Sequence, residues 1–199
     1  MTKFIKVPNQ WQNQSVLTNK IIRALKINSY WQWVLFKALI ICVLICLIWL
    51  IDSITKSLNF DPTNLNISTY ENSLYGIKSV FNPGLTFFQW FNFQPELSII
   101  HLFNFLLLIV CAGAISYQIN HGWSLLIGLS LITGASLGNM IDRFIYEQGV
   151  RDWLYLPWIN QGASVFNLAD MFALSGSIVC LLTLIWQIVA NWRTKKHSL

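Results

Sequence analysis

Long apolar stretches dominate the chain and alternate with polar segments. Four of these stretches, at residues 34–51, 97–117, 123–141 and 171–190, are long enough to be membrane spans. A transmembrane helix needs about 20 predominantly apolar residues to cross about 30 Å of hydrocarbon. The pattern therefore predicts an all-α membrane protein with four transmembrane helices.

The distribution of positive charge predicts the orientation of these spans. Nine of the thirteen Lys and Arg residues lie before the first span, near its start, or after the last span. Segments rich in Lys and Arg stay in the cytoplasm. We therefore expect a basic cytoplasmic extension at residues 1–33, a transmembrane domain at 34–190 and a cytoplasmic tail at 191–199. The extension fits either an amphipathic helix on the inner leaflet or an unstructured tail.

The two segments on the outer side, residues 53–96 and 142–170, contain or border all eight acidic residues. Residues 69–80 have the mixed polarity of short strands, and residues 87–93 are rich in the aromatic side chains that favour a membrane interface. We expect a small β-containing platform in the first outer segment, resting on the membrane.

Overall composition agrees with this class of protein. Of the 199 residues, 55% are hydrophobic and only 11% are charged, and the mean hydropathy is +0.52. A typical soluble domain is more polar than this. The net charge of +5 follows from the cytoplasmic Lys and Arg residues. No nucleic-acid-binding motif accompanies that charge, so a nucleic-acid partner is not expected.

Polar residues gather at the outer ends of the third and fourth spans. The motif at residues 138–143 (GNMIDR) closes the third span, the motif at 166–170 (FNLAD) opens the fourth, and Asp152 lies between them. Singly, each acid has a structural explanation: Asp170 as a first-turn carboxylate with Asn167 as N-cap, Asp142 as an ion pair with Arg143, and Asp152 as a solvated loop residue. Together, these carboxylates at the membrane edge suggest acid–base chemistry.

Other functions remain open at this point. An ion- or proton-coupled transporter could use the acids as a relay, although relay acids are expected near the middle of the membrane. A non-enzymatic scaffold is a further alternative. The third span also carries Ser130, Gly134 and Gly138 at intervals of four, which predicts close packing against a neighbouring helix.

Five short blocks, in this order, resemble the lipoprotein signal peptidases, also called signal peptidase II: Asp52 with Lys56, Asn82-Pro83-Gly84, the motif at 138–143, Val150 with Asp152, and the motif at 166–170. The resemblance runs from about residue 48 to residue 176. It implies a membrane aspartic endopeptidase that removes the signal peptide from diacylglyceryl-modified bacterial prolipoproteins, cutting just before the lipidated cysteine. A presenilin-type peptidase is not indicated, because the chain has no Gly-x-Gly-Asp motif.

The resemblance also implies roles for particular residues. Asp152 and Asp170 match the catalytic pair. Residues that match site-shaping or substrate-binding positions are Asp52, Lys56, Asn82, Gly84, Asn139, Asp142, Arg143, Asn167 and Ala169. No metal or cofactor is expected. The implied partners are a diacylglyceryl prolipoprotein, membrane lipid and the inhibitor globomycin, and the implied location is the bacterial cytoplasmic membrane with the site at its outer face.

Overall fold

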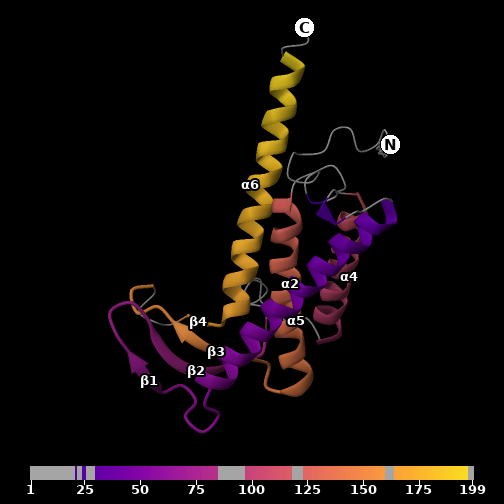
Figure 1. Cartoon of the computed structure of the whole chain (residues 1–199). Helices are drawn as coiled ribbons and strands as arrows, with labels where there is room; N and C mark the ends of the chain where they lie inside the picture. The colour runs from indigo at the N-terminus through magenta and orange to yellow at the C-terminus, as the bar shows by residue number, and fades with distance from the viewer. Residues whose placement is uncertain are drawn as a thin grey trace.

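The computed structural model describes residues 21, 24, 25, 30–84, 97–117, 123–159 and 164–196. In this part of the chain, long helices form a bundle with a small sheet at one end (Figure 1). The helices are α2 (Tyr30–Asn59), α4 (Leu97–Tyr117), α5 (Trp123–Ile145) and α6 (Leu168–Lys196). The strands are β1 (Ser68–Glu71), β2 (Gly76–Asn82), β3 (Val150–Tyr155) and β4 (Val165–Phe166).

Three helices of the described chain are long and apolar enough to cross a membrane. These candidate spans are Trp31–Asn59, Trp123–Ile145 and Leu168–Ala190. Helix α4 has 21 residues, of which Leu102–Gly113 form its apolar stretch. The protein is thus a multi-pass membrane protein, and a fourth span at α4 stays a prediction. Helices α2, α5 and α6 extend beyond the predicted spans, because polar turns continue each helix past its apolar part.

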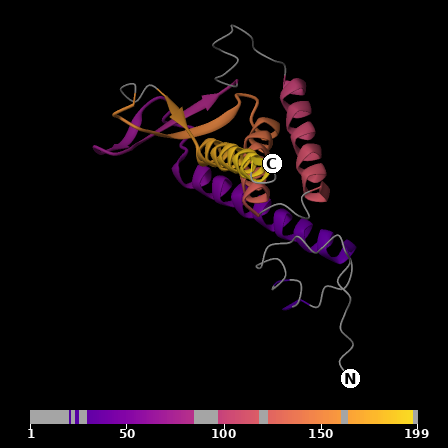
Figure 2. The same cartoon turned by 90° about the horizontal axis from the view of Figure 1, so that it is seen from above.

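Helix α5 lies at the centre of the bundle and packs against α2, α4 and α6. Figure 2 shows the sheet on one side of α6 and α4 on the other. A Cβ atom at Gly134 would lie 2.8 Å from Cβ of Ile48 in α2, and one at Gly128 would lie 2.6 Å from Sγ of Cys180 in α6. The prediction of close packing through small residues is confirmed, since larger side chains would separate these helices.

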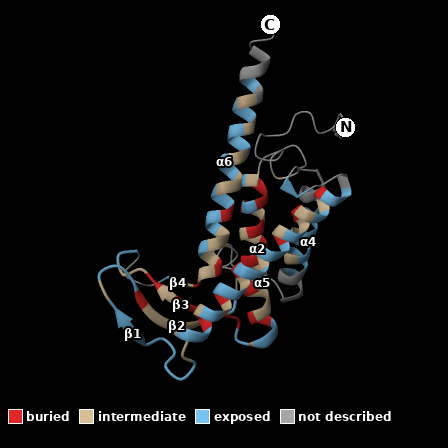
Figure 3. Ribbon diagram, viewed as in Figure 1, coloured by how far each residue is buried: buried red, intermediate tan, exposed pale blue. Residues whose placement is uncertain are grey.

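The outward surface of the bundle is apolar. Figure 3 shows buried residues concentrated along α5 and near the sheet, whereas most of α6 is exposed. Large apolar side chains of α6, such as Leu174 and Trp186, are 65% and 71% exposed. A surface of this kind is costly in water and is favoured in lipid.

The sheet is antiparallel, with the strand order β1-β2-β3-β4. It lies at the end of the bundle where α2 and α5 finish and α6 begins (Figure 1). The expected β-containing platform is confirmed in part: β1 and β2 come from the first outer segment, as predicted, and β3 and β4 come from the second. The aromatic segment 87–93 and most of the extension at residues 1–33 lie outside the described residues.

Candidate active site

Helix α6 begins with a reciprocal cap formed by Asn167 and Asp170. The backbone N–H of Asp170 donates to Oδ1 of Asn167 (3.1 Å), and the backbone N–H of Asn167 donates to Oδ2 of Asp170 (3.2 Å). Such a capping box satisfies two N–H groups that a helix start leaves free. The expected N-cap at Asn167 is therefore confirmed, and the cap fixes Asp170 at the sheet end of the bundle.

Asp152 lies in β3 and is only 1% exposed. Its oxygens accept hydrogen bonds from two side-chain amides: Asn82 Nδ2 donates to Oδ2 (3.1 Å) and Asn167 Nδ2 donates to Oδ1 (2.6 Å). Burial, followed by the negative charge of Asp170, raises the pKa of Asp152 to about 7, although the two amides and Lys56 act to lower it. A carboxyl with such a pKa exchanges protons readily near neutral pH.

Asn139 connects Asp170 to a buried lysine. The Asn139 side chain donates from Nδ2 to Oδ1 of Asp170 (3.1 Å) and accepts at Oδ1 from Nζ of Lys56 (2.9 Å). Because Lys56 can only donate and an ionised carboxylate can only accept, these two contacts define which way the amide points. Asn139 is therefore held in one orientation toward Asp170.

A cluster of buried charges lies behind the two catalytic candidates, and we call its members, Asp52, Lys56, Asp142 and Arg151, the Lys56 cluster. Lys56 Nζ lies 2.6 Å from Oδ2 of Asp52 and 3.1 Å from Oδ2 of Asp142. Arg151 Nη2 lies 2.8 Å from Oδ1 of Asp142. The backbone N–H of Ala169 donates to Oδ1 of Asp52 (2.9 Å). Two acids and two bases balance, as buried charges require.

A cavity of about 240 Å³ opens where α5, α6 and the sheet meet. Asp152 and Asp170 both line it. Its other lining residues are Asn82, Gly84, Asn139, Arg143, Val150, Ser164, Val165 and Phe166.

Arg143 lines the cavity and has an unsatisfied hydrogen-bonding group. Its Nη1 donates to the carbonyl of Asn139 (3.2 Å), while its buried Nε has no hydrogen-bond partner among the described residues. A buried donor without a partner is unfavourable. The wall is therefore suited to a ligand that brings an acceptor oxygen.

The two carboxyls have different surroundings within one cavity. Asp152 accepts from two side-chain amides, and Asp170 accepts from one side-chain amide and the helix start. Different surroundings separate the pKa values of neighbouring acids, so that one is ionised while the other keeps its proton. Such a pair can activate a water molecule and protonate a carbonyl oxygen. Within the described chain, no three His, Cys, Asp or Glu side chains gather as a metal site.

The structure brings all the predicted site residues to this end of the bundle. Asn82, Gly84, Asn139 and Arg143 line the cavity with the two acids, whereas Asp52, Lys56, Asp142, Asn167 and Ala169 lie behind them.

Two structural explanations offered for single acids were wrong. Asp142 forms ion pairs with Lys56 and Arg151, and none with Arg143. Asp152 is a buried strand residue rather than a solvated loop residue. The partners of Asp142 are Lys56, which is distant in sequence, and Arg151, which lies across a turn. The partners of Asp152 are the amides of Asn82 and Asn167. Adjacency along the chain reveals none of these contacts.

Sequence reasoning did not single out Arg151 or Gly149. Gly149 has a φ of +114°, and a Cβ atom there would lie 2.2 Å from the carbonyl oxygen of Asn82. Glycine is thus required both for the backbone conformation and for the close approach of β2 to the start of β3. Adjacency to Asp152 was the only local signal for Arg151, and it does not indicate that the partner of Arg151 is Asp142.

Comparisons with known proteins agree with this architecture. A family model described as signal peptidase (SPase) II matches residues 44–186. A lipoprotein signal peptidase of Streptococcus agalactiae is 30% identical over 158 residues, which cover 78% of this chain and 97% of the relative. One from Neisseria meningitidis is 31% identical over 114 residues, covering 55% of this chain and 66% of the relative.

The fold also resembles solved structures. A chain described as a bacterial membrane enzyme superposes with a TM-score of 0.64 at 19% identity, covering 74% of this chain and 88% of that chain. At this identity, the likeness supports the fold alone. Because the family model spans most of the chain and the Streptococcus relative aligns over nearly its whole length, the chain belongs to the signal peptidase II family.

Proposed function

We propose that this protein removes the signal peptide from diacylglyceryl-modified prolipoproteins, cutting just before the lipidated cysteine. The observation that carries the proposal is the pair of carboxyls, Asp152 and Asp170, in one cavity at the junction of helices and sheet. Membership of the signal peptidase II family supports a peptidase. A site at the end of a membrane bundle suits a substrate whose signal peptide and acyl chains both remain in the bilayer.

In the proposed mechanism, water is the nucleophile. One carboxyl accepts a proton from the water, and the other donates a proton to the substrate. The ionised Asp accepts a proton from water as the water oxygen attacks the scissile carbonyl carbon. The protonated Asp donates its proton to the carbonyl oxygen, giving a neutral tetrahedral diol. When the C–N bond breaks, one diol hydroxyl returns its proton to the pair and the leaving amine takes another. The pair is then restored, with apparent pKa values that belong to both residues.

The surrounding amides have a positioning role in this scheme. Asn82 and Asn167 hold the two oxygens of Asp152, and Asn139 holds one oxygen of Asp170. Fixed geometry of this kind lowers the entropic cost of reaching the transition state. Arg143, in the cavity wall, binds a backbone carbonyl or a lipid ester of the substrate through its guanidinium group.

The position of the acids favours a peptidase over a transporter. Asp142, Asp152 and Asp170 gather at one end of the bundle, beside the sheet, rather than along a path through the bundle. A proton or ion relay needs polar groups near the middle of the membrane. Lys56 and Arg151 also pair with Asp142 and leave it no free charge for ion binding.

We propose that the cavity faces the outer side of the bacterial cytoplasmic membrane. Helix α2 begins, and helix α6 ends in a basic last turn, at the other end of the bundle from the sheet. The sequence before α2 is also rich in Lys and Arg, which favour the cytoplasmic side. Cysteine labelling with a membrane-impermeant reagent in intact cells tests this: Gln148→Cys is expected to react, and lack of reaction would contradict the proposed orientation.

The activity is tested with purified protein and two forms of one precursor peptide. The lipidated precursor is expected to be cut before its cysteine, with inhibition by globomycin, whereas the unlipidated precursor is expected to remain intact. Absence of cleavage, or equal cleavage of both precursors, would contradict the proposed function.

A further inference from the structure

Arg151 lies next to a catalytic candidate yet outside the cavity. Side chains of successive strand residues point to opposite faces. Val150 and Asp152 line the cavity, and Arg151 contacts Asp142 at the end of α5. We propose that Arg151 is a positioning residue for catalysis, which locks the strand beside Asp152 onto α5 and completes the charge balance of the Lys56 cluster. This inference rests on the proposed function.

The contact between Arg151 and Asp142 is unusually complete. Both Nη2 (2.8 Å) and Nε (3.2 Å) of Arg151 donate to Oδ1 of Asp142, and the Arg151 backbone N–H donates to Oδ2 (3.1 Å). One carboxylate thus holds both the side chain and the backbone of Arg151. Because the next residue along the strand is Asp152, this attachment fixes the catalytic strand relative to the helix that carries Asn139 and Arg143.

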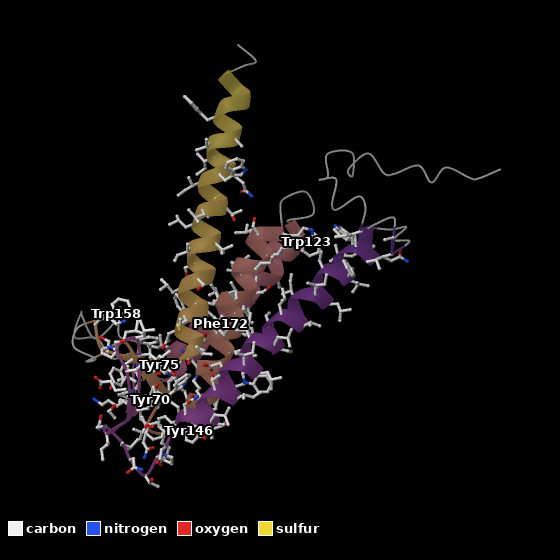
Figure 4. The ribbon with its side chains drawn as sticks, turned by 60° about the vertical axis from the view of Figure 1, so that its left-hand side comes forward. Tyr70, Tyr75, Trp123, Tyr146, Trp158 and Phe172 are labelled. Carbon is white, nitrogen blue, oxygen red and sulfur yellow. The ribbon has the colours of Figure 1, made fainter. Side chains whose placement is uncertain are left out.

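The Tyr146 ring holds the guanidinium from a second direction. The Arg151 Cζ atom lies 4.7 Å from the ring centroid of Tyr146, and that ring lies 5.8 Å from the ring of Phe81 in β2. Figure 4 shows Tyr146 at the end of the bundle where the sheet is attached. A planar guanidinium suits stacking and a forked contact at once, and a lysine ammonium cannot reproduce both.

Asp142 connects this contact to the other half of the site. Its Oδ2 lies 3.1 Å from Lys56 Nζ, and Lys56 donates to Asn139, which donates to Asp170. A continuous path of contacts therefore joins the two catalytic candidates through Arg151. Without Arg151, Asp52 and Asp142 would share one cation, and the site would gain a net negative charge close to Asp152.

The loss of that cation has a predictable sign. A less positive environment disfavours the ionised form of a carboxyl, so the titration of Asp152 moves to higher pH. The other groups that act on Asp152 or Arg151 in the described chain come from every element packed here: Lys56 of α2, Asp142 and Arg143 of α5, Tyr146 just after α5, Asn82 of β2, Asn167 just before α6, and Asp170 of α6.

The test compares Arg151→Gln, Arg151→Lys and the control Lys78→Gln, which removes one positive charge from β2 outside the Lys56 cluster. The first readout needs no substrate: the protein is labelled with ¹³Cγ-aspartate, and the Asp152 signal, one of five, is identified with Asp152→Asn and followed against pH. Arg151→Gln is expected to raise the Asp152 midpoint. Arg151→Lys and Lys78→Gln are expected to leave it near that of the unaltered protein.

The second readout is cleavage of lipidated precursor across pH. We expect kcat to fall roughly tenfold to a hundredfold in Arg151→Gln, with little change in KM and a pH optimum moved upward. Arg151→Lys is expected to keep the pH optimum, because it keeps the positive charge. It is expected to lose part of kcat, because an ammonium group cannot reproduce the contact that two guanidinium nitrogens make with Asp142. An unchanged Asp152 midpoint in a folded Arg151→Gln, or full kcat in Arg151→Lys, would overturn the inference. Failure of the unaltered protein to cleave would refute only the proposed function, since the titration still tests Arg151.

Discussion

Replacing Asp152 with Asn is expected to change stability in opposite directions at high and low pH. The substitution keeps the shape of the side chain and removes its ability to ionise. Asp152 is 1% exposed and its pKa is raised to about 7 by burial and by Asp170. A group that resists ionisation in the native state destabilises that state whenever the pH forces it to ionise.

The magnitude follows from the two pKa values of this residue. An unfolded chain releases the proton near the usual value of 3.8, whereas the native protein holds it until about pH 7. Since the unfolded state binds fewer protons across this window, stability falls as the pH rises. Each pH unit is worth about 1.4 kcal/mol, so the loss by pH 8 is about 4 kcal/mol. The Asp152→Asn variant does not have this loss, because Asn does not ionise. The variant loses about 1–2 kcal/mol instead, because its NH₂ group cannot accept one of the two hydrogen bonds that Asp152 accepts.

The measurement is thermal unfolding of both proteins in one detergent at pH 3 and pH 8. At pH 8 the net gain of about 2–3 kcal/mol raises the Tm of Asp152→Asn by roughly 4–12 °C. At pH 3, below the unfolded pKa of 3.8, only the lost hydrogen bond remains, and the Tm falls by a few degrees.

A matched control has the opposite sign. Asp61 is partly exposed, and hydrogen bonds from Thr63 and Asn64 lower its pKa. Its stabilising contribution is therefore present above the unfolded pKa of 3.8 and is lost as the pH falls below it, so Asp61→Asn is expected to lower the Tm more at pH 8 than at pH 3. The reasoning is refuted if Asp152→Asn shifts the Tm by the same amount, in the same direction, at both pH values.

Two other substitutions and one pH profile have clear expected outcomes. Gly138→Ala should lower both the cleavage rate and the Tm, because its Cβ would lie 2.6 Å from Oδ2 of Asp52. In the control Gly113→Ala, the Cβ would have nothing within 4 Å, so the cleavage rate should be unchanged in the same assays. Lys56→Met should destabilise by about 3–5 kcal/mol, because it leaves two buried acids with one cation, and Lys78→Met should have little effect when their denaturant midpoints are compared. The pH profile of cleavage should show a limb near pH 7, set by the buried carboxyl of the catalytic pair, and a rate that is constant between pH 5 and 9 would contradict this assignment.

The helices and the location of the site could be predicted because their signals are local. The long apolar stretches mark the spans, and the two residues of the helix cap, Asn167 and Asp170, are only three positions apart. The positions of the polar motifs at span ends then predict a common site. Local patterns also located the two strands in the first outer segment.

The other half of the sheet could not be predicted in the same way. Asp152 belongs to β3 because that strand pairs with β2: Val80 lies opposite Asp152, and Asn82 lies opposite Val150. Such pairing depends on residues about 70 positions away in the sequence. The role of Asp142 was obscure for the same reason. Its neighbour Arg143 turns toward the cavity, and its actual partners are Lys56 and Arg151.

The central claim is that Asp152 and Asp170 together perform the cleavage. The most direct measurement is single-turnover cleavage of a lipidated precursor by Asp152→Asn, Asp170→Asn and the control Asp61→Asn, each shown to be folded by its thermal transition. We expect no detectable cleavage by the first two variants and an unaltered rate for the third. Cleavage at the original rate by either Asp152→Asn or Asp170→Asn would contradict the proposed catalytic pair.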